Sequence, residues 1–279
     1  MNFQELIITK ANGQSENFSI EKFRTSLFRA KATPEEIERV VEILQTKLYP
    51  GIKTREIYKM ASQILQQKSP GNASRFGLKK AIKELGPSGF PFERFVAALF
   101  EQQGFKTEVG QTLQGKCVTH EVDVIGRKAD QIMLVECKYH NRPGFTVDVK
   151  IPLYINSRFQ DLLENHFSSG EHKQFTGWIA TNARFSDDAI SYSLCRGIQL
   201  LGWDYPRGNA LKDWIDRSGL YPLTCLGSLS SAEKKYLLEK EVVLVKELEN
   251  QDHWLRKAGI PEVRMNKVKN EIASLLQDN

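Results

Sequence analysis

The sequence predicts a multidomain α/β protein with three segments. The first is mainly helical with a small β-hairpin, the central one is an α/β layer with a mixed sheet, and the third is small and helical. Three observations predict this class. The stretch GPSG at 86–89 breaks a helical pattern. Helix-like and strand-like stretches alternate between 90 and 218. Apolar residues recur at helical spacing from 219 to 279. We therefore expect domains at 1–86, 90–218 and 219–279.

Composition excludes several classes of protein. With 41% hydrophobic and 26% charged residues, the 279-residue chain has the composition of a folded, water-soluble protein. The first twenty residues lack a basic start before an apolar run, and no apolar stretch reaches bilayer-spanning length. We expect a cytoplasmic protein with no membrane partner. The four cysteines have no C-x-x-C spacing, so reduced thiols are expected rather than a zinc site.

The positive charge is concentrated in the first segment. Residues 1–85 contain 15 Lys and Arg against 9 Asp and Glu, whereas the rest of the chain is close to neutral. A polyanionic ligand is favoured there, and a solvated basic face is the alternative. The segment begins with the strand-like LIITK, an Asn12-Gly13 turn and a helix capped by Ser19. Further helices are expected after Thr33-Pro34, over TREIYKMASQILQQ, and over RFGLKKAIKEL after a closing SPGNAS.

The central segment begins with a helix over FERFVAALFEQQG, followed by two strands, EVDVI and IMLVECK. A helix around LYINSRFQDLLENH and a strand–loop–helix–strand pattern complete the segment. Because side chains alternate along a strand, Glu136 and Lys138 share one face. If the two strands pair antiparallel, Asp123 lies near the same edge. Two carboxylates and a lysine then converge at the end of an apolar sheet.

Such a cluster calls for a ligand, because like charges in a buried site disfavour ionisation. A divalent cation resolves this, since Asp123 and Glu136 offer the hard oxygen ligands that Mg²⁺ prefers. Lys138 would orient or deprotonate an attacking water, or neutralise charge on a phosphate. The alternative is a solvated sheet edge on which these side chains pair with one another.

The spacing D-x(12)-E-x-K, preceded by a helix with Glu93, resembles the PD-(D/E)xK nuclease superfamily, and most of 90–218 is similar to the Mrr-like restriction endonuclease domain. The resemblance implies a catalytic site of Glu93, Asp123, Glu136 and Lys138, with Mg²⁺ or Mn²⁺ held by Asp123 and Glu136. One feature departs from the family: Thr119-His120-Glu121 replaces the small, glycine-rich residues that usually precede the aspartate.

The following helix contains candidate DNA contacts. Lys150 and Tyr154 match a spacing that the superfamily often has, and Arg158 follows on a similar face. Contacts to DNA phosphates are one interpretation, and an exposed helix with local ion pairs is the other.

The first segment contains the stretches ITKANGQSENFSIEKF and LYPGIKTREIYKMA. They resemble the ATP-cone, the nucleotide-sensing domain of many ribonucleotide reductases. The resemblance implies that Lys10 and Lys22 bind the triphosphate of ATP or dATP, that Glu16 contacts the ribose or base, and that Thr54 lies by the base or phosphates. It also implies a nucleotide-dependent homo-oligomer. Without a G-x-x-x-x-G-K-[ST] motif, binding without hydrolysis is expected. A basic helical DNA-binding module is the alternative.

The third segment contains LRKAGIPEVRMNKVKNEIASLL, which resembles a helix-hairpin-helix element, whose turn binds DNA phosphate through backbone N–H groups. Arg256, Lys257 and Arg264 are candidate DNA contacts. Residues 220–279 hold equal numbers of acidic and basic residues, so a packing or oligomerisation role is the alternative.

Together the three segments predict a metal-dependent DNA endonuclease, regulated by adenine nucleotide and acting in restriction and defence. Two alternatives stay open. One is a non-catalytic, nucleotide-sensing DNA-binding regulator, and the other is a DNA repair or junction nuclease with the same site.

Overall fold

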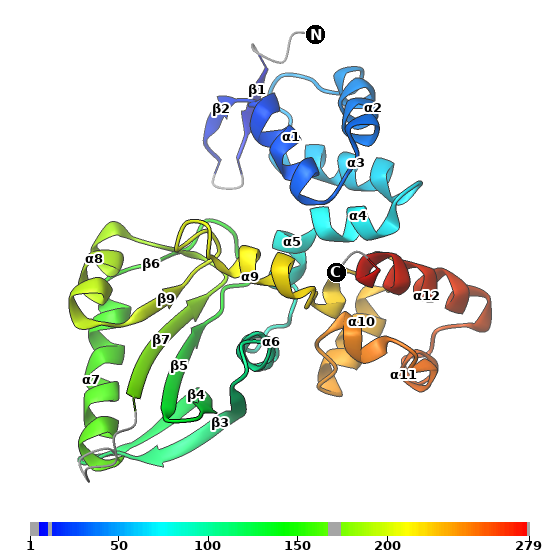
Figure 1. Cartoon of the computed structure of the whole chain (residues 1–279). Coiled ribbons are helices and arrows are strands. Elements are labelled where there is room, and N and C mark those ends of the chain that lie inside the picture. Colours follow the sequence, from blue (N-terminus) through cyan, green and yellow to red (C-terminus); the bar gives the residue numbers. More distant parts are fainter. Residues whose placement is uncertain (1–5, 11–12, 167–173, 278–279) are drawn as a thin grey trace. The chain divides into compact units, whose positions relative to one another are not determined.

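The computed structural model describes residues 6–10, 13–166 and 174–277, and the chain divides into two compact units. The first unit combines residues 1–84 with 221–279, and the second is residues 85–220 (Figure 1). The mixed α/β class predicted from the sequence is confirmed. Our division into three domains stays a prediction, but its first and third segments pack together in one unit. No helix of the described residues is long and apolar enough to cross a membrane.

The first unit starts with a small antiparallel hairpin of β1 (Ile7–Thr9) and β2 (Ser15–Asn17). Residue 12 of the predicted turn lies outside the described residues. Helix α1 (Ile20–Arg29) begins where predicted, because the Ser19 hydroxyl accepts a hydrogen bond from the Lys22 amide. Helix α2 (Pro34–Gln45) follows the predicted Thr33-Pro34 start, and Thr33 forms a capping box with Glu36.

Three more helices complete this segment: α3 (Thr54–Gln66), α4 (Pro70–Phe76) and α5 (Leu78–Lys83). SPGNAS, which was expected to precede the helix over RFGLKKAIKEL, instead contains the start of α4. Helix α4 begins at Pro70, because a proline at the first helical position loses no hydrogen bond. Phe23, Leu27 and Ile57 are buried in a core that α1, α2, α3 and α4 share.

The C-terminal segment is helical, as expected: η2 (Leu223–Cys225), α10 (Ser231–Glu239), η3 (Val245–Leu248), α11 (Asp252–Lys257) and α12 (Glu262–Leu276). The helical pattern of this segment is interrupted between η3 and α11. Asn250 between them has a left-handed backbone with φ 56°, which a continuous helix does not allow. Helices α4 and α12 pack together. The Arg75 guanidinium of α4 donates to the Leu275 carbonyl at 2.8 Å.

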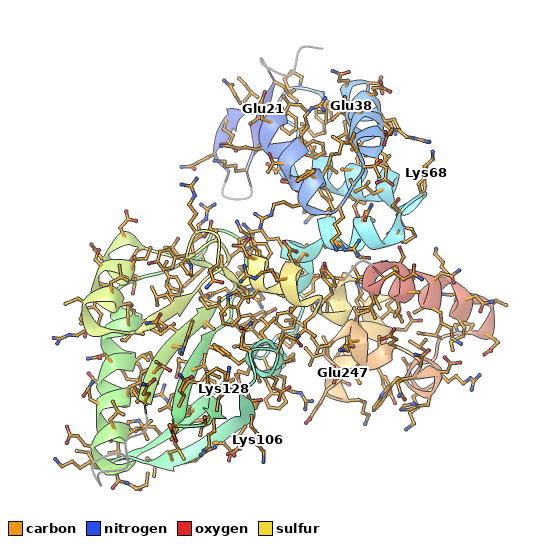
Figure 2. All side chains as sticks on the ribbon, in the orientation of Figure 1. Glu21, Glu38, Lys68, Lys106, Lys128 and Glu247 are labelled. Carbon is orange, nitrogen blue, oxygen red and sulfur yellow. The ribbon has the colours of Figure 1, made fainter. Side chains whose placement is uncertain are left out.

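The second unit is built on a five-stranded sheet in the order β3-β4-β5-β7-β9. Strands β3 (Lys106–Gln114), β4 (Thr119–Lys128) and β5 (Gln131–Lys138) are antiparallel, whereas β7 (Gln174–Thr181) and β9 (Gln199–Leu201) extend the sheet in parallel. The mixed sheet was expected, but β3 was not. Figure 2 shows Lys106 and Lys128, both exposed, where β3 begins and β4 ends.

Helices cover both faces of this sheet (Figure 1). Helix α6 (Phe90–Glu101) packs on β3, β4 and β5, beside α9 (Leu211–Ser218). Phe100, Trp178 and Trp214 meet edge to face there, with centroids 5.2–6.0 Å apart. Helices α7 (Lys150–His166) and α8 (Asp187–Arg196) lie on the other face, with a short parallel pair of β6 (Thr146–Val147) and β8 (Arg184–Phe185).

Candidate active site

The predicted trio comes together where β4 and β5 lie side by side. Val124 pairs with Val135, so Asp123 and Glu136 occupy the next positions on the two strands. The Cys137 amide donates to Asp123 Oδ2 at 2.6 Å, and Lys138 Nζ lies 2.6 Å from Glu136 Oε1. Antiparallel pairing therefore brings both carboxylates and the lysine to one edge of the sheet, as strand alternation predicted.

The acids at this edge are crowded and partly removed from water. Glu136 is only 5% exposed. Burial, reinforced by the Glu136 charge, raises the pKa of Asp123 to about 6. Glu93 projects from the first turn of α6, and its pKa is raised to about 7 by burial and by Asp123, Glu121 and Glu136. The cluster therefore retains protons near neutral pH in the absence of additional positive charge.

A fifth residue, Arg158 of α7, completes the cluster. Its Nη1 lies 2.7 Å from Glu136 Oε2, its Nη2 donates to the Glu121 carbonyl, and its side chain is 14% exposed. Contact with DNA phosphates and local ion pairs were the two interpretations of Arg158. Its guanidinium forms an ion pair with Glu136, and its contact with DNA stays a prediction. Tyr154 is exposed and its ring lies 5.6 Å from that guanidinium, while the Lys150 amide donates to Asp148 at the start of α7. Their contacts with DNA stay a prediction.

The residues fit a divalent cation of the kind that relies on few protein ligands. Among the described residues, no three His, Cys, Asp or Glu side chains are arranged to hold a metal ion. Mg²⁺ is commonly bound through one or two carboxylates, with waters and substrate phosphate filling the other positions. Asp123 and Glu136 are such a pair, and the charge of Glu136 adds to burial in raising the pKa of Asp123. A cation at this edge would offset that charge.

Buried polar residues at the end of β7 hold the end of β5 in place. The Thr181 hydroxyl donates to the Lys138 carbonyl at 2.6 Å. The Asn182 side chain accepts from the His140 amide at 2.9 Å and donates to the His140 carbonyl at 2.8 Å. Thr181 and Asn182 are 0% and 3% exposed. The sequence analysis missed them, although polar residues at the end of an apolar strand are a recognisable signal.

Family comparisons agree with this geometry. Residues 86–214 match a restriction endonuclease model of the Mrr type, residues 6–76 match an ATP cone domain model, and residues 221–276 match an AF1548-like C-terminal model. An uncharacterized protein of Archaeoglobus fulgidus is 37% identical over 131 residues, which are 47% of this chain and 71% of that protein. The chain belongs to the family of Mrr-like restriction endonuclease domains joined to an ATP-cone. The resemblances to the Mrr-like domain and to the ATP-cone are confirmed.

Two solved structures show the extent of the likeness. The crystal structure of AF1548, a protein of unknown function, is 28% identical with a TM-score of 0.57, and the match covers 69% of this chain and all of that one. The MspJI restriction endonuclease in complex with a 27-mer oligonucleotide is 18% identical with a TM-score of 0.37, over 63% of this chain and 37% of that one.

Three of the four predicted nucleotide ligands of the ATP-cone lie around its hairpin. Lys10 and Glu16 form an ion pair of 2.5 Å, with both side chains more than 40% exposed. The Thr54 hydroxyl donates to the Thr9 carbonyl at 3.2 Å, so the start of α3 lies against β1. Lys22 is exposed on the first turn of α1, where free N–H groups favour an anion. Nucleotide contacts from these residues stay a prediction.

The C-terminal candidates differ in how accessible their charges are. Arg264 is engaged within the AF1548-like domain: its guanidinium binds both carboxylate oxygens of Glu233, which is 7% exposed. Arg256 is exposed and lies 3.8 Å from Glu262, and Lys257 Nζ lies 5.3 Å from the Trp254 ring. Arg264 thus has a packing contact already, and the predicted DNA contacts and the helix-hairpin-helix likeness stay predictions.

Proposed function

We propose that this protein is a divalent-metal-dependent DNA endonuclease that acts in restriction, and that adenine nucleotide bound to the ATP-cone regulates it. The observation that carries the proposal is the convergence of Asp123, Glu136 and Lys138 within the restriction endonuclease domain. An acidic cluster with raised pKa values is a costly feature for a mere scaffold, which favours a catalytic role.

Each residue has a distinct part in the proposed reaction. Asp123 and Glu136 would hold Mg²⁺ or Mn²⁺, which supplies Lewis-acid polarisation of a phosphodiester and lowers the pKa of a bound water. Lys138 donates to negative charge that develops on the phosphate during hydrolysis. Glu93, with its pKa raised to about 7, accepts or returns a proton at working pH. Arg158 keeps Glu136 oriented through their ion pair.

Cleavage of supercoiled plasmid tests the nuclease. Wild-type protein is incubated with and without Mg²⁺ or Mn²⁺, and with no nucleotide, ATP or dATP. We expect metal-dependent nicking that is lost in Lys138→Ala and Glu136→Ala, because each removes a group that contacts the reacting phosphate or the metal. Lys128→Ala is the matched control, since Lys128 is an exposed lysine of the same sheet. Full cleavage by folded Glu136→Ala would refute the proposed site.

Calorimetric titration with ATP and dATP tests the regulatory site. Lys10→Ala and Lys22→Ala should each weaken binding by about tenfold or more, because a charged hydrogen-bond donor to phosphate is lost. Lys68→Ala, an exposed lysine at the end of α3 (Figure 2), should bind as wild type does. Light scattering with each nucleotide tests the proposed homo-oligomer, and an unchanged mass in ATP and dATP would count against it.

A further inference from the structure

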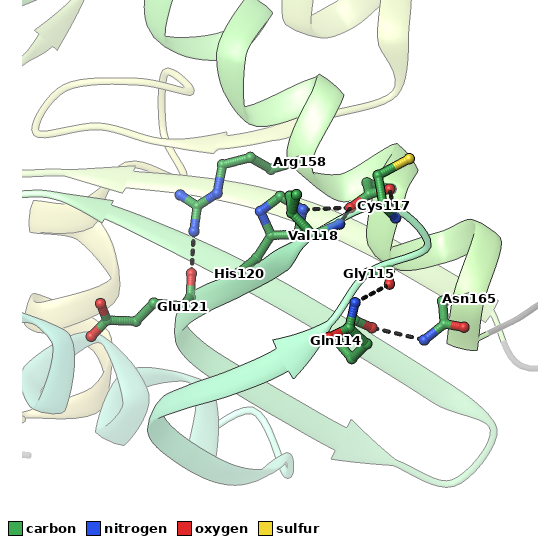
Figure 3. A network of polar contacts seen from close by, with 9 residues as sticks. Gln114, Gly115, Cys117, Val118, His120, Glu121, Arg158 and Asn165 are labelled. Atoms are coloured by element: carbon green, nitrogen blue, oxygen red, sulfur yellow. Dashed lines mark hydrogen bonds and ion pairs between the residues drawn. The ribbon is translucent and has the colours of Figure 1, made fainter.

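A network of polar contacts fastens α7 to the segment that leads into β4 (Figure 3). The carboxylate of Asp161 on α7 accepts from the Cys117 amide at 2.8 Å, from the Val118 amide at 3.3 Å and from His120 Nε2 at 2.8 Å. The His120 and Asp161 side chains are 11% and 14% exposed. The hydrogen bond from His120 contributes most to a pKa of about 2 for Asp161. An ionised carboxylate with three donors fixes the helix to the loop.

The loop is shaped around this carboxylate. The Gly115 amide donates to the Val118 carbonyl at 2.8 Å, and the Lys116 amide donates to the Asp161 carbonyl at 3.0 Å. A side chain at Gly115 would come within 2.6 Å of the Val118 carbonyl and would also overlap the Asp161 carboxylate. The close approach therefore requires glycine at this position.

Arg158, which contacts Glu136 of the candidate site, lies on the same face of α7 as Asp161. Arg158 and Asp161 are three residues apart, so they lie on one side of α7. Arg158 donates to the Glu121 carbonyl, one residue beyond His120, and also binds Glu136. Residues 117–121 are thus held by α7 at two neighbouring points, and the second of these points is part of the candidate site.

We propose that Asp161 and His120 are positioning residues for the nuclease site: they fix α7 so that Arg158 presents its guanidinium to Glu136. This gives a role to His120, which stands where related domains have small residues. The hydrogen bonds of Asp161 to Cys117, Val118 and His120 form a clamp between α7 and this loop. Without the clamp, α7 can shift against β4. Glu136 then loses its ion pair with Arg158 and keeps the one with Lys138. Displacement of a catalytic group by about an ångström can lower a rate about a hundredfold. The kinetic part of this inference rests on the proposed nuclease function.

A double-mutant cycle between Asp161→Asn and Arg158→Ala tests the inference on plasmid cleavage. Asp161→Asn should lower kcat by about ten- to a hundredfold with little change in KM, because substrate binding does not involve the clamp. It should cause little further loss in the Arg158→Ala background, since Asp161 acts through Arg158. His120→Gln keeps an N–H donor and should retain more activity than His120→Ala.

Glu164→Gln is the matched control. It removes an ion pair of 2.7 Å between Lys116 and Glu164, which joins the same loop to the same helix but has side chains that are 64% and 54% exposed. The variant should cleave at the wild-type rate, because exposed ion pairs contribute little. A loss equal to that of Asp161→Asn would mean that any weakening of this loop has the same effect, and would overturn the specific role of Asp161.

The same cycle, measured by urea unfolding, does not depend on cleavage. Three of the four tryptophans lie in this unit, so their fluorescence reports mainly on its unfolding. Arg158→Ala should lower the unfolding midpoint less in the Asp161→Asn background than in wild type, because the Arg158–Glu136 pair is already weakened. Additive midpoints would overturn the inference. If the two substitutions have non-additive effects on the unfolding midpoint but additive effects on kcat, the clamp stabilises the fold without positioning Arg158 for catalysis. That outcome would overturn its part in catalysis. If wild-type protein cleaves no DNA, the nuclease proposal fails while the unfolding cycle still decides the clamp.

Discussion

The ionised form of Asp123, which is the form proposed to bind the metal, destabilises the fold. Its pKa rises from 3.8 to about 6 because burial and Glu136 disfavour the charged form. The folded protein therefore binds more protons here than the unfolded chain between these two pH values. By linkage, this residue lowers the free energy of unfolding as pH rises through that window.

We predict that Asp123→Asn stabilises the nuclease unit at pH 8 by about 1–3 kcal/mol, following the free energy of a pKa shift of this size. The asparagine oxygen can still accept the hydrogen bond from the Cys137 amide. At pH 3.5, where aspartate is mostly protonated in both states, the difference should shrink to a few tenths of a kcal/mol. Urea unfolding at the two pH values measures it. A less stable variant at pH 8 would contradict the cause assigned to the shift.

The raised pKa values also predict how metal affinity depends on pH. Asp123, with a pKa of about 6, must lose its proton before it can bind a cation. Glu93, with a pKa of about 7, lies close enough for its protonation to respond to a cation bound at Asp123. Affinity for Mn²⁺ should increase by up to about a hundredfold per pH unit below pH 6, where both acids lose a proton on binding, and by about tenfold per unit between pH 6 and 7, and it should level off above pH 7. Calorimetry from pH 5 to 8 measures this dependence. Glu93→Gln should remove the increase between pH 6 and 7, and a curve unchanged in that variant would exclude Glu93 from the cluster.

How far the site could be predicted follows from the distance of each contact along the chain. Glu136 and Lys138 are neighbours on one strand, so alternation places them on one face. Arg158 is 22 positions from Glu136, and Asp161 is 41 positions from His120. Those contacts depend on how α7 packs against the sheet, and no local pattern encodes that packing.

Helices and strands were likewise predictable where neighbouring residues determine them, and were missed where distant contacts do. Helix α2 is predictable because Thr33, Pro34 and Glu36 satisfy its first turn locally. Strand β3 was missed because it is an edge strand with mostly exposed or half-buried side chains, so it lacks an apolar run. Helix α4 was missed because glycine and proline normally indicate a turn, and its glycine serves a contact with α12 instead.

The contact between α4 and α12 is close and polar. Glu271 of α12 is 1% exposed, and its carboxylate accepts from the Ser74 hydroxyl at 2.7 Å and from the Gly227 and Ser228 amides at 2.8 Å each. A buried carboxylate is tolerated because these donors replace water. Helix α4 therefore joins the ATP-cone to the AF1548-like domain through contacts that allow little displacement.

We predict that Gly71→Ala destabilises this unit by about 1–3 kcal/mol, the typical cost of overpacking. An added Cβ would lie 2.5 Å from the Ser274 backbone oxygen, so the two helices would have to separate. Gly77→Ala is the matched control, because its Cβ would meet only ordinary contacts at 3.5 Å and its φ is −77°. Hydrogen exchange of α4 and α12 measures the effect. Equal protection in the two variants would contradict the close approach.

At the scale of the whole molecule, the nuclease segment is inserted between two parts of one unit. Residues 85–220 interrupt a unit made of the ATP-cone and the AF1548-like domain. Within that unit, the Asn72 side-chain amide donates to the capping residue Glu36 at 3.1 Å. Arg75 donates to the Asn72 side-chain oxygen at 3.0 Å and to the Leu275 carbonyl at 2.8 Å. These contacts connect the helices of the cone to α12, so a displacement of the cone helices is expected to displace α12 as well.

Nucleotide binding should therefore protect residues that lie outside the cone. We predict that saturating ATP slows amide exchange in α12 as well as in α1–α3, because a ligand that binds the folded cone stabilises every element that unfolds with it. Mass spectrometry of the full chain measures this. Arg75→Lys keeps the charge but loses the forked donors to Asn72 and Leu275, so protection of α12 should fall while ATP affinity is retained. Unchanged α12 protection on ATP binding to wild type would show that the cone and the AF1548-like domain unfold independently. The proposed regulation of the nuclease would then have to depend on contacts of the cone other than those with α12.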